Sequence, residues 1–124
     1  MESFTNMKIF IVGSRKYHSE IQHLCKELNK KGVKASTAGE WNPKIKDTFQ
    51  SEKKALLKAF KKISASDIVY IYAKEGYVGK TVAMEIAYAY ARNKKIISSE
   101  KIHELSAQAL IIKVENTDKF LERF

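Results

Sequence analysis

Short apolar segments alternate with longer amphipathic segments along this chain. The clearest apolar segment is DIVYIYA (67–73), whose β-branched and aromatic residues predict a buried strand. Similar segments predict further strands at 8–12, 33–36, 94–98 and 109–114. Because strands and helices alternate, the sequence predicts an α/β fold. We expect a doubly wound, flavodoxin- or Rossmann-like parallel sheet of about five strands, with helices on both faces.

The segments between the strands have helical periodicity. Apolar residues three and four positions apart predict a helix over 19–31, and they include Cys25, which we therefore place in the core. A second helix is predicted over 49–64, with Phe49, Leu56, Phe60 and Ile63 on one side. Further helices are expected at 81–93, 100–108 and 117–124. Residues 1–124 are predicted to form one domain.

Composition excludes several classes of protein. The single cysteine excludes an internal disulfide and a cysteine-based zinc site, and the three histidines are scattered, so no metal or cofactor is predicted. The N-terminus lacks a signal-peptide pattern, and no apolar run approaches the roughly 20 residues of a membrane span. We therefore expect a cytoplasmic protein with no membrane partner.

The net charge of +9 raises the question of a nucleic-acid partner. Nearly all of the 23 basic residues are lysines spread over predicted helix surfaces, whereas base recognition relies on arginine. The charge pattern therefore argues against nucleic acid as the primary partner. It suits a small anionic ligand such as a nucleotide.

Two polar, glycine-containing loops lie where a parallel sheet binds its ligand. They are Gly13–His18, after the first strand, and Lys74–Lys80, after the third. The second loop runs into Gly79-Lys80-Thr81, the end of a phosphate-binding P-loop pattern, but Lys74 stands where that pattern requires its first glycine. The sequence therefore does not predict an NTPase.

The second loop still has features that favour an anion. Gly76 and Gly79 allow close backbone approach, Thr81 can cap the following helix, and Lys80 adds a positive charge. A glycine turn with a capped helix and a solvated lysine explains the same residues without a ligand.

Two acids are candidates for chemistry. Glu85 falls one turn into a helix among apolar residues, near the carboxyl edge of the predicted sheet. The alternative is a carboxylate that is simply stabilised by the helix dipole. Asp67 begins the third strand, and its alternative role is that of a cap or turn residue.

The stretch ASDIVYIYAKEGYVGKTVAMEIAYAYARNKKII, together with KIFIVGSRKYHSEIQHLCKEL, resembles the nucleoside 2-deoxyribosyltransferase family. That family includes transferases that exchange the base of a deoxynucleoside and hydrolases that cut 2′-deoxynucleoside 5′-monophosphates. The likeness covers roughly residues 7–114 and rests mainly on Ala83-Met84-Glu85-Ile86-Ala87-Tyr88-Ala89.

The resemblance implies a role for several residues. Glu85 matches the family's nucleophile, which attacks the anomeric carbon of the sugar, and Asp67 matches the acid that handles the proton of the departing base. Gly13, Ser14 and Arg15 match the loop around the sugar and its 5′ group, and Ser106 matches a segment that reaches a neighbouring subunit's site. The resemblance also implies a homodimer or larger oligomer.

One position departs from the family pattern. Six residues before the nucleophile, the transferases have an aspartate and the hydrolases a serine, but this chain has Gly79 followed by Lys80. A glycine amide, a lysine and a helix N-terminus would attract a 5′-phosphate. The departure also leaves open a nucleotide-binding sensor without turnover.

Two further readings stay open. A phosphoribohydrolase-like loop is a minor alternative, although the spacing from Thr81 to Glu85 is one residue too long for it. Tyr17, Trp41 and Tyr77 could stack on a base or could be ordinary loop packing.

Overall fold

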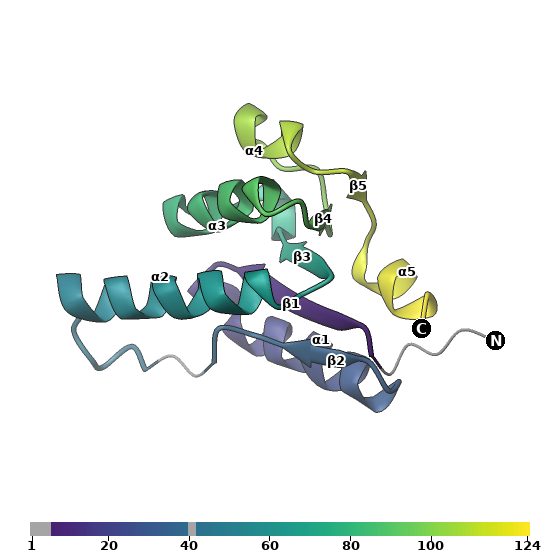
Figure 1. Cartoon of the computed structure of the whole chain (residues 1–124), viewed down its shortest axis with the longest axis horizontal. Helices are drawn as coiled ribbons and strands as arrows, with labels where there is room; N and C mark the ends of the chain where they lie inside the picture. Colours follow the sequence, from purple (N-terminus) through teal and green to yellow (C-terminus); the bar gives the residue numbers. More distant parts are fainter. Residues whose placement is uncertain (1–5, 40–41) are drawn as a thin grey trace.

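The computed structural model describes residues 6–39 and 42–124. Its centre is a five-stranded sheet with the order β2-β1-β3-β4-β5, in which every neighbouring pair is parallel (Figure 1). The strands are β1 (Lys8–Gly13), β2 (Lys34–Ser36), β3 (Ile68–Tyr72), β4 (Lys95–Ser98) and β5 (Lys113–Val114). The predicted doubly wound parallel sheet is confirmed.

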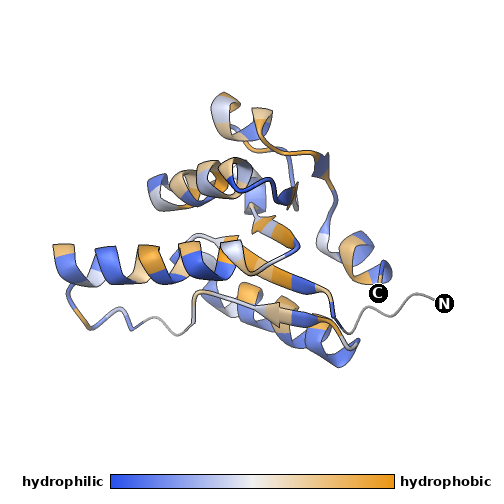
Figure 2. Cartoon of the chain, in the orientation of Figure 1, coloured by the Kyte–Doolittle hydropathy of each residue, from blue (hydrophilic) through white to orange (hydrophobic). Residues whose placement is uncertain are grey.

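Helices cover both faces of this sheet. The helices are α1 (His18–Lys30), α2 (Phe49–Ser64), α3 (Lys80–Ala91), α4 (Leu105–Ala109) and α5 (Thr117–Glu122), with short 3₁₀ turns η1 (Arg15–Tyr17) and η2 (Lys74–Gly76). One apolar cluster joins α1 and α5 to the sheet, and a second joins α2, α3 and α4 to the opposite face. Hydrophobic segments accordingly concentrate in the strands and on the helix sides that face them (Figure 2).

The central strand β3 shows why its sequence is apolar throughout. Val69 and Ile71 pack toward α2 and α3, whereas Ile68 and Tyr70 pack toward α1 and α5. A strand buried on both faces needs apolar residues at every position rather than at every second one. Tyr70 satisfies its hydroxyl by donating to the backbone oxygen of Glu115 at 2.8 Å.

The strand order reverses between β1 and β3, which creates the crevice where such sheets bind ligands. The loops that follow these two strands contact each other. The hydroxyl of Tyr17 donates to the backbone oxygen of Lys74 at 3.5 Å, and Nζ of Lys16 lies 3.9 Å from the centre of the Tyr77 ring. The two predicted ligand loops are therefore neighbours at the carboxyl edge of the sheet.

Four local predictions are wrong. The helix expected over 100–108 forms only from Leu105 to Ala109. The strand expected at 109–114 is reduced to two residues, because Ala109 ends α4 and the amides of Leu110 and Ile111 close turns on that helix. Phe49 is 94% exposed, because the first turns of α2 extend past the sheet. The residue that caps α3 is Gly79 rather than Thr81.

In the part of the chain that the structure describes, no helix has the length and apolar character needed to cross a membrane.

Candidate functional site

Two adjoining cavities lie at the carboxyl edge of the sheet. The outer cavity, of about 570 Å³, lies between the start of α3, the start of α2 and the loop after β1. The inner cavity, of about 130 Å³, lies against β1, between α1 and the residues that follow β2. The outer volume is within the range of small-molecule sites. The residues shared by both cavities are Gly13, Ser14, Arg15, Ala38, Ala55 and Glu85.

Glu85 is the one buried acid in this shared wall among the described residues. It is 7% exposed, because its neighbours Val82, Ile86 and Ala89 hold α3 against the sheet. Burial raises the pKa of Glu85 to about 7, while the positive charge of Arg15 acts in the opposite direction. A carboxyl group with such a pKa changes its charge near neutral pH, which is typical of functional sites.

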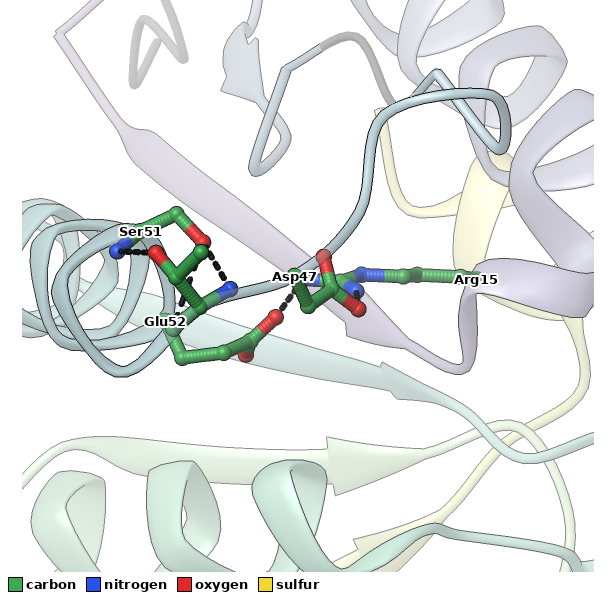
Figure 3. A network of polar contacts seen from close by, with 5 residues as sticks. Arg15, Asp47, Ser51 and Glu52 are labelled. Carbon is green, nitrogen blue, oxygen red and sulfur yellow. Dashed lines mark hydrogen bonds and ion pairs between the residues drawn. The ribbon is translucent and has the colours of Figure 1, made fainter.

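Arg15 connects the walls of the outer cavity. Its guanidinium donates from Nη1 to Asp47 Oδ2 and from Nη2 to Glu52 Oε1, both at 3.1 Å (Figure 3). The start of α2 is fixed by a reciprocal cap, in which Thr48 and Ser51 each accept the other's backbone amide. This cap holds Glu52 in the first turn, facing Arg15.

The N-terminus of α3 forms another wall of the outer cavity. Its cap, Gly79, has no side chain to bond the first amides of the helix, and Lys80 and Thr81 line the cavity beside it. A Cβ atom added at Gly79 would meet only the hydroxyl of Tyr77, at 3.5 Å, so the space above this turn is open. Uncapped amides, the helix dipole and Lys80 together favour an anion here.

Most of the predicted site residues come together at these cavities. Those that line one or both are Gly13, Ser14, Arg15, Gly79, Lys80, Thr81 and Glu85. Three others do not. Tyr17 packs edge-on against Tyr72, with ring centres 5.7 Å apart, Gly76 supports the segment around His103, and Ser106 is exposed on α4. Trp41 lies outside the described residues.

Asp67 is at the wrong edge of the sheet for its predicted role. Its Oδ2 accepts the amide of Lys8 at 2.9 Å, and its own amide donates to the Lys8 oxygen at 2.8 Å. It therefore joins the amino ends of β1 and β3. The five residues of β3 place it roughly 16 Å from the carboxyl edge. An aspartate that opens a parallel strand cannot reach a ligand bound where that strand ends.

Sequence reasoning missed four polar residues that line the cavities. Asp47 and Glu52 precede or begin α2, while Thr37 follows β2 and Gln22 lies on α1. The rule that ligands bind at the carboxyl ends of strands also applies to β2, and it could have indicated Thr37. Nothing in the local pattern distinguished the other three from surface residues.

Within the described ranges, no group of three or more histidine, cysteine, aspartate or glutamate side chains is placed to hold a metal ion.

Comparison with known proteins gives structural likenesses only. No protein-family model matches the sequence, and no curated protein matches it. A conserved protein from Enterococcus faecalis V583 has a TM-score of 0.69 at 16% identity, covering 94% of this chain and 95% of its own. A 2-deoxyribosyltransferase from Bacillus psychrosaccharolyticus has a TM-score of 0.65 at 16% identity, covering 92% of this chain and 90% of its own.

A pilus assembly-related protein from Burkholderia pseudomallei has a TM-score of 0.57 at 10% identity, covering 99% of this chain and 90% of its own. The chain thus shares its fold with a 2-deoxyribosyltransferase and with a protein of a different described role. Since one fold serves many functions, the function has to be argued from the site.

Proposed function

We propose that this protein cleaves or transfers at the N-glycosidic bond of a nucleotide or nucleoside, with Glu85 as the nucleophile. One observation carries the proposal: a buried carboxyl group lies where two cavities meet, in a fold shared with a 2-deoxyribosyltransferase. If the N-glycosidic bond lay at that junction, the base would occupy one cavity and the sugar the other.

The proposed reaction has two steps. The Glu85 carboxylate forms a bond to the anomeric carbon, the bond from that carbon to the base nitrogen breaks, and the base leaves with the electron pair and takes up a proton. Water, or a second base, then attacks the same carbon. This attack releases the sugar from Glu85 and restores the carboxylate, and with water one proton returns to the solvent.

The proton for the departing base has to come from a group other than Asp67, because Asp67 lies at the opposite edge of the sheet. Asp47 and Glu52 are carboxyl groups that line the outer cavity together with Glu85. Arg15 holds both of them. These two groups, His18 on the wall of the inner cavity and solvent water are the routes for this proton.

A 5′-phosphate fits the outer cavity better than a free 5′-hydroxyl does. Gly79, Lys80 and Thr81 present uncapped amides and a positive charge there, and the carboxyl groups of Asp47 and Glu52 in the same cavity are paired with Arg15. We therefore propose a nucleoside 5′-monophosphate as the preferred ligand. If nucleosides bound more tightly than their 5′-monophosphates, this preference would be refuted.

The second candidate function is a nucleotide-binding sensor without turnover. The position of Asp67 favours it, because the one acid that the sequence offered as a proton donor does not reach the cavity. A sensor would bind the same ligand and would not release its base.

We also propose a homodimer or larger oligomer. Ser106 is exposed on α4 and does not line either cavity of its own chain, so a role for it in the site requires a second subunit. Leu105, beside it, is 80% exposed, and Met84 on the neighbouring α3 is 48% exposed. Sedimentation of the purified chain should give at least twice the monomer mass, and a strictly monomeric protein would exclude the shared site.

The decisive test of the function is base release, measured by chromatography. The substrates are ribo- and deoxynucleosides and their 5′-monophosphates. We expect release with the wild type and none with Glu85→Gln. Glu122→Gln, which removes an exposed acid on α5, is the matched control and should behave as the wild type. If no substrate loses its base while a monophosphate still raises the melting temperature, the sensor function is supported instead.

A further inference from the structure

The inner cavity contains a donor and an acceptor whose directions are fixed by their neighbours. On its wall, the side-chain amide of Gln22 donates from Nε2 to Thr37 Oγ1 at 2.9 Å and to the backbone oxygen of Gly39 at 3.5 Å. A backbone oxygen can only accept a hydrogen bond, so the atom of Gln22 that faces it must be the nitrogen. The amide oxygen of Gln22, Oε1, therefore points the other way.

The hydroxyl of Thr37 is oriented by the same network. Its Oγ1 accepts from Gln22 at 2.9 Å and from the amide of Gly39 at 3.2 Å, which uses both of its lone pairs. The hydroxyl can then act only as a donor toward a third group. Nζ of Lys62 also binds the backbone oxygen of Thr37 at 2.6 Å, so this residue is held in place from two sides.

Both positions are left without a partner in the protein. Among the described residues, neither Oε1 of Gln22 nor the hydroxyl hydrogen of Thr37 has a hydrogen-bond partner. Among the described residues, every fully buried side-chain oxygen or nitrogen has a hydrogen-bond partner. Because Oε1 of Gln22 has none, this atom must be accessible to solvent. Gln22 and Thr37 line the inner cavity, as Glu85 does, so its wall carries this acceptor and this donor in addition to the side chains of Ser14, Arg15 and His18.

We infer that the inner cavity binds the base of the substrate and selects a base that carries an amino group beside an unprotonated ring nitrogen, as in adenine and cytosine. This inference rests on the proposed function. The amino group would donate to Oε1 of Gln22, and the ring nitrogen would accept from Thr37. Hypoxanthine and uracil place an oxygen and an N–H at these positions. They would set acceptor against acceptor and donor against donor.

The volumes of the two cavities agree with a base in the inner cavity and a sugar and phosphate in the outer one. The inner cavity of about 130 Å³ suits a single flat ring system, whereas the outer cavity of about 570 Å³, with its anion-attracting helix start, suits the sugar and phosphate. Glu85 lines both cavities, so the bond between base and sugar would lie beside its carboxyl group.

The test compares matched substrates that differ only in this group: the 5′-monophosphates of deoxyadenosine and deoxyinosine, and those of deoxycytidine and deoxyuridine. We expect the wild type to favour the amino-bearing member of each pair by about tenfold to a hundredfold in kcat/KM, since a mismatched buried polar group costs that factor. A ratio near one in the wild type would overturn the inference.

Variants locate the selectivity. Gln22→Met and Thr37→Val keep the shape of each side chain and remove its polar group, and we expect each to bring the ratio within about threefold of one. The ratio is taken within one variant, so a general loss of folded protein cancels. Gln50→Met, on the exposed start of α2, is the control and should leave the ratio unchanged. A wild-type ratio that survives both cavity variants would also overturn the inference.

Free bases separate this inference from the proposed function. Calorimetric titration with adenine and with hypoxanthine needs no turnover. A preference for adenine that Gln22→Met removes would support the inference even if no nucleotide were cleaved. If nucleotides were cleaved without any preference between the paired bases, the proposed function would stand and the inference would fail. If no base bound and no nucleotide were cleaved, both would fail.

Discussion

The guanidinium of Arg15 and the carboxyl group of Glu85 line the same two cavities, and they act on each other through their charges. Burial raises the pKa of Glu85 from its ordinary value of 4.5 to about 7, and the positive charge of Arg15 opposes that rise. Arg15 is itself shared with Asp47 and Glu52, so part of its charge is already neutralised. The ionisation of Glu85 is therefore set by the balance of these groups.

Activity should increase with pH through about 7. A nucleophilic carboxyl group has to be ionised, and the pKa of Glu85 is raised to about 7. Below this pH the ionised fraction falls about tenfold for each pH unit, so kcat/KM at pH 5 should be roughly a hundredfold lower than at pH 8. The measurement is base release across pH 5–9. A rate that is flat over this range would contradict a nucleophilic role for Glu85.

Replacing Glu85 by Gln should stabilise the protein at high pH. The folded-state pKa, about 7, is above the ordinary value of 4.5, so between these pH values the native state holds a proton that the unfolded state has released. Wild-type stability therefore falls as pH rises through this window. Above pH 7 the cost is up to about 3 kcal/mol, and a neutral glutamine avoids it.

Urea unfolding at pH 4.5 and pH 8 checks this prediction. Glu85→Gln should exceed the wild type in unfolding free energy at pH 8 and should match it more closely at pH 4.5. Glu122→Gln on α5 serves as the control at both pH values, because its carboxyl group is exposed. An advantage of equal size at both pH values would show that packing, and not ionisation, separates the two side chains.

Removing the charge of Arg15 should move the pH profile. Arg15→Met takes away the positive charge that lowers the pKa of Glu85, so the rise of activity should shift to higher pH. The ion pairs to Asp47 and Glu52 are partly exposed, so the loss of stability should be at most about 1 kcal/mol. Arg15→Lys keeps the charge and should shift the profile less. An unchanged profile in Arg15→Met would show that the two groups are not coupled.

The fold could be predicted because its information is local. IVYIYA (68–73) and IFIV (9–12) are apolar at successive positions, as strands buried on both faces require, and the helical periodicities between the strands fix the alternation. The strand predicted at 109–114 was wrong because the outcome there depends on the surrounding structure and not on the local pattern. Its apolar run resembles a strand, but the turn after α4 and the edge position of β5 leave only two residues to pair.

The site could be predicted only in part, for a geometric reason. Gly13 ends β1 and Ser14 follows it, while Gly79 and Glu85 lie in the loop and the helix after β3, so the rule that ligands bind at the carboxyl ends of strands indicates them. That rule also excludes Asp67, because a strand's first residue lies at the opposite edge. Gln22, Asp47 and Glu52 reach the cavities from helices or a long loop. Their positions depend on how those elements pack, which residue spacing does not reveal.

Gly76→Ala should destabilise the protein and Gly79→Ala should not, although both glycines belong to the loop before α3. Gly76 has φ of +76°, and a Cβ atom there would lie 2.5 Å from the His103 ring and 2.7 Å from the Lys101 backbone oxygen. Left-handed backbone and overpacking against a backbone atom together should cost about 2–4 kcal/mol.

Gly79 is the matched control for this change. Its φ is −82°, and an added Cβ atom would meet only the Tyr77 hydroxyl at 3.5 Å, so its replacement should cost under about 1 kcal/mol through a poorer helix cap. Chemical unfolding of both variants and the wild type gives the comparison. The bond from the His103 amide to the Gly76 oxygen, at 3.0 Å, ties this loop to the segment after β4, so Gly76→Ala should also loosen that segment in hydrogen exchange. Equal stability of the two variants would mean that the loop accommodates a side chain at position 76. The close approach of Gly76 to His103 would then not be what holds this loop in place.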